Sequence, residues 1–464
     1  MKLQSDLRTL LPDAKVHLPG DADLSDAEFA AYGLDRTARY KDQSHASAIV
    51  LPASTQDVAR LVRFARENKI ALVPSGGRTG LAGGAVARNG EVVVALGRMN
   101  RELEFLPHQP ALRVQAGMIL SDLHAAARRR DLLFPVDYAS AGSVQVGGMV
   151  ATNAGGTRVI RYGNTRDQVL GLTCVTGAGD VLEFPGDILK NNSGYDLRQL
   201  VVGSEGTLAI ITDVTLRLVA PPDNCEVVLC ACATFAHVLT LLETIRNAGL
   251  PLLAFECFDA NSLDAVREHL GLPAPFREAH GWYVVLEYEG DPTGFEALLE
   301  RRLLPESTVA DALRAESSAA RRDFWMYREG ISESLSSIYT VHKDDLSLPP
   351  ARMPEFLDDL HELLKASGVR SAIFGHVGDG NLHVNLMAPF DLAPEDFFQR
   401  CRDLDTRIYT TVRELGGSIS AEHGIGLVKR EHLHFSRTPA EIELMRAIKS
   451  AFDPDGILNP GKLL

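Results

Sequence analysis

The stretch from Gly375 to Asn385, Gly-His-Val-Gly-Asp-Gly-Asn-Leu-His-Val-Asn, decides how the second half of the chain folds. The residues on both sides of its glycine-rich centre have the composition and alternation of strands. Gly378 to Asn381 has strong turn chemistry, so we predict a β-hairpin with a four-residue loop. In that register His376 would pair with His383, with the two Cβ atoms ~5 Å apart.

Two imidazoles at this separation could close on one metal ion. Asn385 would share the face of His383 because strand side chains alternate. Glu422, in Ser-Ala-Glu-His-Gly, offers a carboxylate as a third ligand. Two neutral imidazoles and a carboxylate with an open position are typical of catalytic zinc, although another divalent metal would fit. Spacing alone leaves an alternative open, a hairpin with two hydrogen-bonded histidines.

Length and charge restrict the class of protein. At 464 residues the chain is too long for one ordinary core, so two or more domains are expected. It is 45% hydrophobic and 23% charged, as globular proteins are. The net charge of −14 argues against a nucleic-acid surface. An anionic substrate stays compatible if its site is locally positive.

The six cysteines show neither metal-ligand nor disulfide spacing, so we expect reduced thiols and a cytoplasmic protein. The first residues lack the apolar region of a signal peptide, although a processed organellar protein would look the same. No run of about 18 apolar residues occurs, so a membrane-spanning helix is not expected.

The first half reads as α+β and carries two glycine-rich runs. Ser54, followed by Asp57, resembles a capping box before a helix. A strand leads directly into Ser75–Gly84, and a second glycine-rich run spans Gly142–Gly156. Glycine lets backbone N–H groups wrap a pyrophosphate closely. Neither run is a Walker A or Rossmann sequence. Two glycine-rich loops suit a long dinucleotide that is held at several points. Ordinary glycine turns are the alternative interpretation.

The second half begins after Pro221-Pro222, a pair that ends a strand and stiffens a connection. Beyond it, strands alternate with helices, which predicts antiparallel strands with helices on one side. A long helical stretch is expected over about residues 310–337.

Several long motifs point to one family. The loop Pro74–Gly84, the run Gly142–Gly156 and the segments Lys190–Asp196 and Val202–Leu208 closely resemble the flavin domain of the vanillyl-alcohol oxidase superfamily. The remainder resembles the FAD-linked oxidase C-terminal domain, as in D-lactate and D-2-hydroxyglutarate dehydrogenases. The resemblance implies an α+β chain with a PCMH-type FAD-binding domain over 1–220, an antiparallel, ferredoxin-like substrate domain over 221–417 and a C-terminal helical segment over 418–464.

The resemblance also implies which residues meet the cofactor. Some members attach FAD to a histidine in the first loop, whereas Arg78 and Thr79 stand in that region here, so non-covalent FAD is expected. The residues expected along the pyrophosphate are Ser75, Gly76, Gly77, Arg78, Thr79 and Gly80. Those expected elsewhere along FAD are Gly142, Ser143, Gly148, Thr152 and Ala154, with Ile210 and Asn459 near the flavin ring.

The substrate side needs a cation for a carboxylate, a base for the hydroxyl proton and a hydride acceptor. Arg328 offers a planar fork, and Ser332 is predicted one helical turn later on the same face. Without the family comparison, Lys343 would be interpreted as forming a surface ion pair with Asp344 or Asp345. In the family comparison, however, its motif Lys-x-Asp-Leu-Ser-Leu-Pro resembles the D-2-hydroxyglutarate branch, where a second cation suits a second carboxylate.

The resemblance assigns His376, His383 and Glu422 as zinc ligands, Asn385 as a substrate contact and His423 as the general base. A second-shell role for His423, orienting Glu422, is the alternative. Together these assignments imply oxidation of a D-2-hydroxy acid, with hydride passing from C2 to flavin N5.

Rival functions stay open at this point. The nearest is the same chemistry on D-lactate, D-malate or glycolate. A non-catalytic flavoprotein subunit and a flavin-free metal hydrolase are the others. An electron-transfer flavoprotein or a quinone is expected as the electron acceptor. A homodimer is expected because it is the commonest oligomer of soluble proteins.

Overall fold

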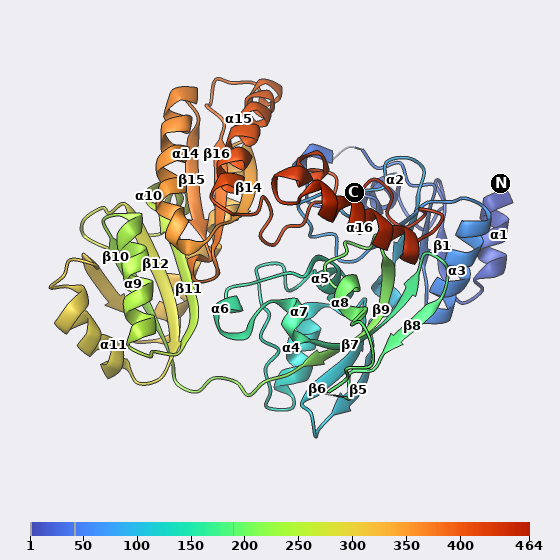
Figure 1. Ribbon diagram of the computed structural model, residues 1–464, viewed down its shortest axis with the longest axis horizontal. Coiled ribbons are helices and arrows are strands. Elements are labelled where there is room, and N and C mark those ends of the chain that lie inside the picture. The colour runs from blue at the N-terminus through green and yellow to red at the C-terminus, as the bar shows by residue number, and fades with distance from the viewer. Residues whose placement is uncertain (1, 41–42, 189) are drawn as a thin grey trace. The chain divides into compact units, whose positions relative to one another are not determined.

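The computed structural model describes residues 2–40, 43–188 and 190–464 (Figure 1). The chain divides into two compact units. Unit 1 comprises residues 1–156, 163–221 and 422–464, and unit 2 comprises residues 157–162 and 222–421. The C-terminal segment thus belongs to the same unit as the N-terminal half.

Unit 1 contains two sheets. The first has the order β1-β2-β4-β3, in which β2, β4 and β3 are parallel. Its strands are β1 (Lys15–His17), β2 (Ala48–Leu51), β3 (Leu72–Ser75) and β4 (Val92–Ala95). The second is antiparallel with the order β5-β6-β9-β7-β8. Its strands are β5 (Glu102–Leu106), β6 (Ala111–Gln115), β7 (Val169–Thr176), β8 (Val181–Phe184) and β9 (Ala209–Arg217).

Short helices cover these sheets. They are α1 (Lys2–Leu10), α2 (Asp26–Tyr32), α3 (Thr55–Glu67), α4 (Leu120–Arg128), α5 (Val146–Thr152), α7 (Thr165–Gln168), α8 (Arg198–Val201) and α16 (Pro439–Phe452). Ser54 caps α3 as predicted, because its side chain accepts a hydrogen bond from the Asp57 N–H at 3.2 Å. One hydrophobic core joins both sheets of the unit, from Leu7 to Leu458.

Unit 2 is built on one seven-stranded sheet with the order β13-β10-β12-β11-β15-β16-β14. All its described pairings are antiparallel. The strands are β10 (Cys225–Cys232), β11 (Leu252–Asp259), β12 (Trp282–Glu289), β13 (Asp311–Arg314), β14 (Val341–Ser347), β15 (Arg370–Gly375) and β16 (Asn381–Met387). The helices are α6 (Val159–Tyr162), α9 (Phe235–Asn247), α10 (Ala260–Leu270), α11 (Pro292–Leu298), α12 (Ser318–Glu329), α13 (Ile331–Ile338), α14 (Met353–Ser367) and α15 (Pro394–Glu414).

Helices cover both faces of this sheet, so the expectation of helices on one side is wrong. α10, α12 and α13 pack on the face that carries Phe258 and Phe374. On the other face, Phe235 of α9 packs edge-on against Trp282, with ring centroids 4.9 Å apart. Tyr409 of α15 donates to Asp344 on that same opposite face. Figure 1 shows α14 and α15 beside β14, β15 and β16.

The predicted hairpin is present, but its register differs by two residues. Phe374, not His376, pairs with His383. A 3₁₀ turn over Val377–Asp379 lengthens the connection, and Gly380 closes it with a φ of +90°. A slip of two residues keeps every side chain on its predicted face. The His376 and His383 rings therefore still lie together, with centroids 5.4 Å apart.

The predicted helix over residues 310–337 is also different. Residues 311–314 form strand β13, which pairs with β10. The helical remainder is divided at Gly330 into α12 and α13. A Cβ on Gly330 would lie 2.8 Å from Leu270, so glycine allows close packing against α10.

Candidate active site

The two glycine-rich runs of unit 1 pack directly against each other. A Cβ on Gly77 would lie 2.1 Å from the Ser143 carbonyl oxygen, so only glycine allows this approach. Arg78 has a left-handed φ of +56°, and its guanidinium lies 4.5 Å from the centroid of the Tyr32 ring. A left-handed residue among glycines turns successive N–H groups toward one side, as anion-binding backbone does.

Polar groups around these loops fit a bound cofactor. Four buried side-chain atoms there have no hydrogen-bond partner among the residues that the structure describes: Ser75 Oγ, Tyr138 Oη, Gln145 Oε1 and Asn459 Oδ1. Buried polar atoms are normally paired, so these atoms are suited to a ligand's donors and acceptors. Cβ atoms on Gly142 and Gly148 would meet open space. Burial, with Glu422 and Asp137 nearby, raises the pKa of Tyr138, which keeps its hydroxyl protonated.

The other expected cofactor residues have structural contacts of their own. Asn459 donates through Nδ2 to the carbonyls of Gly84 at 2.9 Å and Glu205 at 2.8 Å. Thr152 donates to the Gly148 carbonyl at 3.1 Å within α5. Ile210 is buried in β9. These contacts fix the chain around the loops, while the cofactor roles of the three residues stay predictions.

In unit 2, the expected substrate and metal residues gather on one sheet face. Lys343 on β14 pairs with Asn385 on β16, and two residues along, Asp345 pairs with His383. His383 pairs in turn with Phe374 on β15. Alternation places these side chains on one face, which α12 and α13 cover in part.

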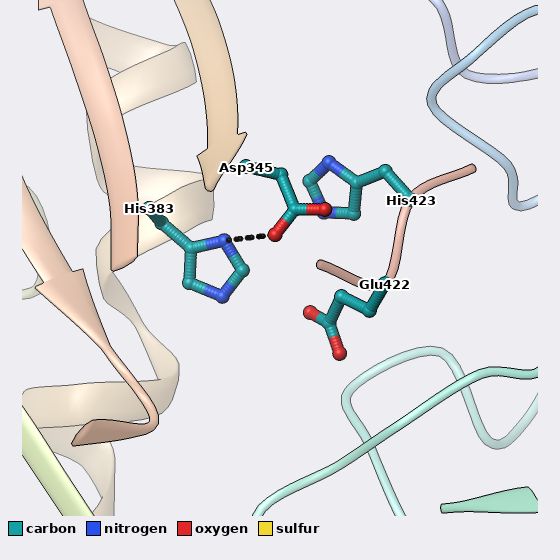
Figure 2. Close-up of side chains that lie close together, drawn as sticks. All are labelled: Asp345, His383, Glu422 and His423. Atoms are coloured by element: carbon teal, nitrogen blue, oxygen red, sulfur yellow. Dashed lines mark ion pairs between the residues drawn. The ribbon is translucent and has the colours of Figure 1, made fainter. Parts of the chain in front are cut away.

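Asp345 is an enclosed acid on this face. It is fully buried, and its Oδ1 lies 3.6 Å from His383 Nδ1 (Figure 2). Oδ1 accepts from Asn381 Nδ2 at 2.8 Å, and Oδ2 accepts from the Ala421 N–H at 3.0 Å. Figure 2 also shows Glu422 and His423, which follow Ala421 in the chain.

These side chains carry the ligand types of a metal centre. Asp345 and His383 of unit 2 belong to a group of carboxylates and imidazoles that could hold a metal ion. The Ala421 N–H donates to the Asp345 carboxylate, and Glu422 is the next residue along the chain. The peptide bond therefore keeps the Glu422 backbone near that carboxylate. Carboxylates and imidazoles are the donors that zinc and similar divalent metals take.

His376 lies outside that group and contacts Glu256 of β11. Its Nδ1 is 2.7 Å from Glu256 Oε1. An ionised carboxylate only accepts, so this contact favours a proton on Nδ1, and in the neutral imidazole Nε2 then keeps its lone pair. This is the tautomer that a histidine needs to bind a metal through Nε2.

Arg328 and the Lys343–Ser332 pair lie around the same face. The Arg328 guanidinium stacks 4.6 Å from the Phe374 ring centroid, and its Nη2 is 2.8 Å from Glu256 Oε2. Its buried Nε has no hydrogen-bond partner in the described part of the chain. Lys343 Nζ donates to Ser332 Oγ at 2.8 Å, and Lys343 makes no ion pair among the described residues. Burial lowers the pKa of Lys343 from its usual value.

Comparison with known proteins decides the family. The profile described as "FAD linked oxidases, C-terminal domain" matches residues 221–463, and the one described as "FAD binding domain" matches residues 46–185. This chain belongs to the FAD-linked oxidase family. The resemblance stated from the motifs is therefore confirmed, and the chain is an FAD-dependent enzyme.

Relatives of this FAD-linked oxidase cover almost its full length. The D-2-hydroxyglutarate dehydrogenase of Xanthomonas citri pv. viticola is 45% identical over 442 residues, which is 94% of this chain and 93% of that protein. The enzyme of the same name from Stutzerimonas stutzeri is 41% identical over 467 residues, 99% of this chain and 98% of that protein. These relatives place the chain in the D-2-hydroxyacid dehydrogenase branch.

Solved structures confirm the PCMH-type fold. p-Cresol methylhydroxylase matches with a TM-score of 0.77 at 15% identity, over 100% of this chain and 96% of that one. Alkyldihydroxyacetonephosphate synthase matches with a TM-score of 0.71 at 19% identity, over 99% and 84%. At such low identity the likeness concerns the fold alone. In the part of the chain that the structure describes, no helix is both long and apolar enough to cross a bilayer.

Proposed function

We propose that this FAD-linked oxidase converts D-2-hydroxyglutarate to 2-oxoglutarate. The observation that carries the proposal is the half-buried Lys343 ammonium, which donates to Ser332 and is on the sheet face that carries His383. The C1 carboxylate of a 2-hydroxy acid would be held at the proposed metal. Arg328 and Lys343, two cations on the same face, suit a substrate with a second, distal carboxylate. The names of the two bacterial relatives support the same substrate.

The metal ligands we propose are His376, His383 and Glu422. Asp345 lies beside His383, because the two residues are paired across strands β14 and β16. When bound, the metal would lower the pKa of the substrate hydroxyl and FAD would accept the C2 hydride. The substrate's C1 carboxylate and hydroxyl would be held at the metal, with Asn385 beside His383 as a polar contact.

The chain's own groups bind and deprotonate the substrate. Arg328, Ser332 and Lys343 would hold the distal carboxylate. His423 would take the hydroxyl proton, since a positioned neutral imidazole is a common general base. The alternative role of His423, orienting Glu422, predicts a loss of metal in a His423 variant. The base role predicts a slow enzyme with its metal retained.

The cofactor contacts proposed from the resemblance are Ser75–Gly80, Gly142, Ser143, Gly148, Thr152, Ala154, Ile210 and Asn459, with FAD held non-covalently. We also propose reoxidation by an electron-transfer flavoprotein or a quinone, a cytoplasmic location and a homodimer. The family resemblance supports the acceptor, and the reduced cysteines support the location.

A substrate panel tests the proposal. The purified, FAD-loaded enzyme is given D-2-hydroxyglutarate, D-lactate, D-malate or glycolate with an artificial electron acceptor, and L-2-hydroxyglutarate serves as the control. We expect the highest kcat/KM for D-2-hydroxyglutarate. A higher value for D-lactate or glycolate would contradict the dicarboxylate assignment while keeping the enzyme class.

A further inference from the structure

The carboxylate of Glu256 lies between two side chains to which the proposed function gives separate tasks. Its Oε1 is 2.7 Å from His376 Nδ1, and its Oε2 is 2.8 Å from Arg328 Nη2. We propose that Glu256 is a positioning residue that couples metal binding at His376 to substrate binding at Arg328. The proposal rests on the proposed function and adds a residue that the motifs did not indicate.

The sheet register explains how Glu256 reaches His376. Phe258 and Cys257 of β11 pair with Phe374 and Gly375 of β15. The next position along each strand brings Glu256 opposite His376, where β15 has ended and the turn begins. β11 and β15 are central strands of the sheet, so the carboxylate has a rigid support.

Because Glu256 is buried, its charge has to be matched by the side chains that it contacts. Its exposed fraction is 0%, and a buried ionised carboxylate is costly unless it is paired and hydrogen-bonded. The Arg328 guanidinium supplies the opposite charge, and the His376 N–H supplies a hydrogen bond. Removing the charge of Glu256 would therefore leave Arg328 buried without its counter-ion.

Each contact has a consequence for the partner. A carboxylate on Nδ1 holds His376 in the tautomer whose Nε2 can bind a metal and raises its basicity. On the other side, Glu256 contacts the guanidinium through Nη2, and the buried Nε of Arg328 has no hydrogen-bond partner among residues 2–40, 43–188 and 190–464. Because the Phe374 ring supports the guanidinium plane, Arg328 has donors left in a fixed orientation for a carboxylate.

One shared anion links the two sites energetically. A metal at His376 draws electron density through the imidazole and strengthens its bond to Glu256. A substrate carboxylate on Arg328 changes the ion pair at the other oxygen. Coupling of this kind is reciprocal, so metal should raise the affinity for 2-oxoglutarate, and 2-oxoglutarate should raise the affinity for metal.

The test uses the full-length, FAD-loaded enzyme and the Glu256→Gln variant. Glutamine keeps the volume and one acceptor, but it removes the charge and presents N–H groups to either Arg328 or His376. Zinc affinity is measured by competition with a chelator and elemental analysis, and 2-oxoglutarate affinity by calorimetry with and without zinc. We expect zinc affinity to fall about 10- to 100-fold. At saturating zinc, the zinc-dependent gain in 2-oxoglutarate affinity should be smaller than in the wild type, because only direct contact with the metal would remain.

Glu287→Gln is the matched control. Glu287 is a buried carboxylate on the neighbouring strand β12, and its ion pair is with Arg158 at 3.7 Å. The Glu287→Gln substitution removes a buried charge whose ion pair is with neither His376 nor Arg328, so zinc affinity should stay at the wild-type value. FAD absorbance and the unfolding temperature of each variant report whether the fold is kept.

Three outcomes separate the two proposals. If the wild-type enzyme binds no stoichiometric metal, both the metal role and this inference are wrong. If the wild type and Glu287→Gln bind zinc, His376→Ala does not, and Glu256→Gln binds it normally, only this inference is overturned. Should Glu256→Gln not fold, Glu256→Asp keeps the charge but shortens the reach, and normal zinc affinity in that variant would contradict the inference.

Discussion

Lys343 on β14 donates its ammonium proton to Ser332 on α13 at 2.8 Å, across eleven positions of sequence. Two residues expected to hold one carboxylate thus meet in space. The surface ion pair with Asp344 or Asp345, the simpler interpretation of Lys343, is not what the structure shows. Asp345 is directed at His383, and Asp344 lies on the opposite face, bound by Tyr409.

Replacing Lys343 with Ala should discriminate between substrates. A hydrogen bond to a charged group contributes about 1.5–3 kcal/mol, so kcat/KM for D-2-hydroxyglutarate should fall about 10- to 100-fold. D-Lactate has no distal carboxylate, and its value should change far less. Equal losses for both substrates in steady-state assays would remove the basis for the dicarboxylate.

The pKa of Lys343 makes substrate binding sensitive to alkaline pH. Burial lowers this pKa below its usual value of 10.5, so the ammonium loses its proton earlier than an exposed lysine does as the pH rises. KM for D-2-hydroxyglutarate should therefore rise on the alkaline side. In a Lys343→Arg variant the guanidinium stays charged, and the alkaline rise should be absent from its pH profile. A rise that persists in Lys343→Arg would assign it to another group.

Two adjacent aspartates on opposite sheet faces should respond differently to substitution by Asn. Asp345→Asn should weaken zinc binding, because it removes a buried charge opposite His383. Asp344→Asn should mainly reduce stability, because Asp344 accepts from Tyr409 at 2.6 Å and lies 3.6 Å from His342. Losing a buried hydrogen-bonded partner costs about 1–3 kcal/mol. Zinc titration and thermal unfolding of both variants check this contrast, and equal zinc loss in both would contradict it.

Asp259 should make the stability of unit 2 depend on pH. It caps α10 by accepting from the Ser262 N–H at 2.8 Å, and burial raises its pKa from 3.8 to about 6. A raised pKa means that the folded state binds the proton more tightly than the unfolded state. The resulting stabilisation is complete below the unfolded pKa of 3.8 and is lost as the pH rises through about 6.

Substituting Asn for Asp259 keeps a good cap and removes the titration. The unfolding temperature of the variant should therefore rise relative to that of the wild type as the pH increases from about 4 to about 7. A constant difference across this range, measured by thermal unfolding, would show that Asp259 does not titrate as stated.

The sequence predicted most of the local structure because local signals were strong. The Ser54 cap of α3 is set by neighbouring residues and occurs as expected. The hairpin register was wrong by two residues because the 3₁₀ turn at Val377–Asp379 depends on a close approach. A Cβ on Gly375 would lie 2.3 Å from the Asn381 carbonyl oxygen. β13 was assigned to a helix because its pairing with β10 is distant in sequence.

For the candidate site, too, some residues were predicted from the sequence and others were missed. Lys343, Asn385 and His383 were found from motifs, and the structure brings them to one face. Glu256 and the metal-group role of Asp345 were missed, since each depends on contacts between strands far apart in sequence. A buried acid inside an apolar strand, as in Leu-Leu-Ala-Phe-Glu256-Cys-Phe, was the one signal that could have indicated Glu256.

The most direct test of the central claim is an anaerobic titration of the purified enzyme with D-2-hydroxyglutarate. The absorbance of oxidised flavin near about 450 nm is followed, since it reports the cofactor that receives the hydride. We predict that the band bleaches rapidly with this substrate and persists with L-2-hydroxyglutarate. A flavin band that remains unchanged with D-2-hydroxyglutarate but bleaches with D-lactate or D-malate would contradict the assignment of the substrate.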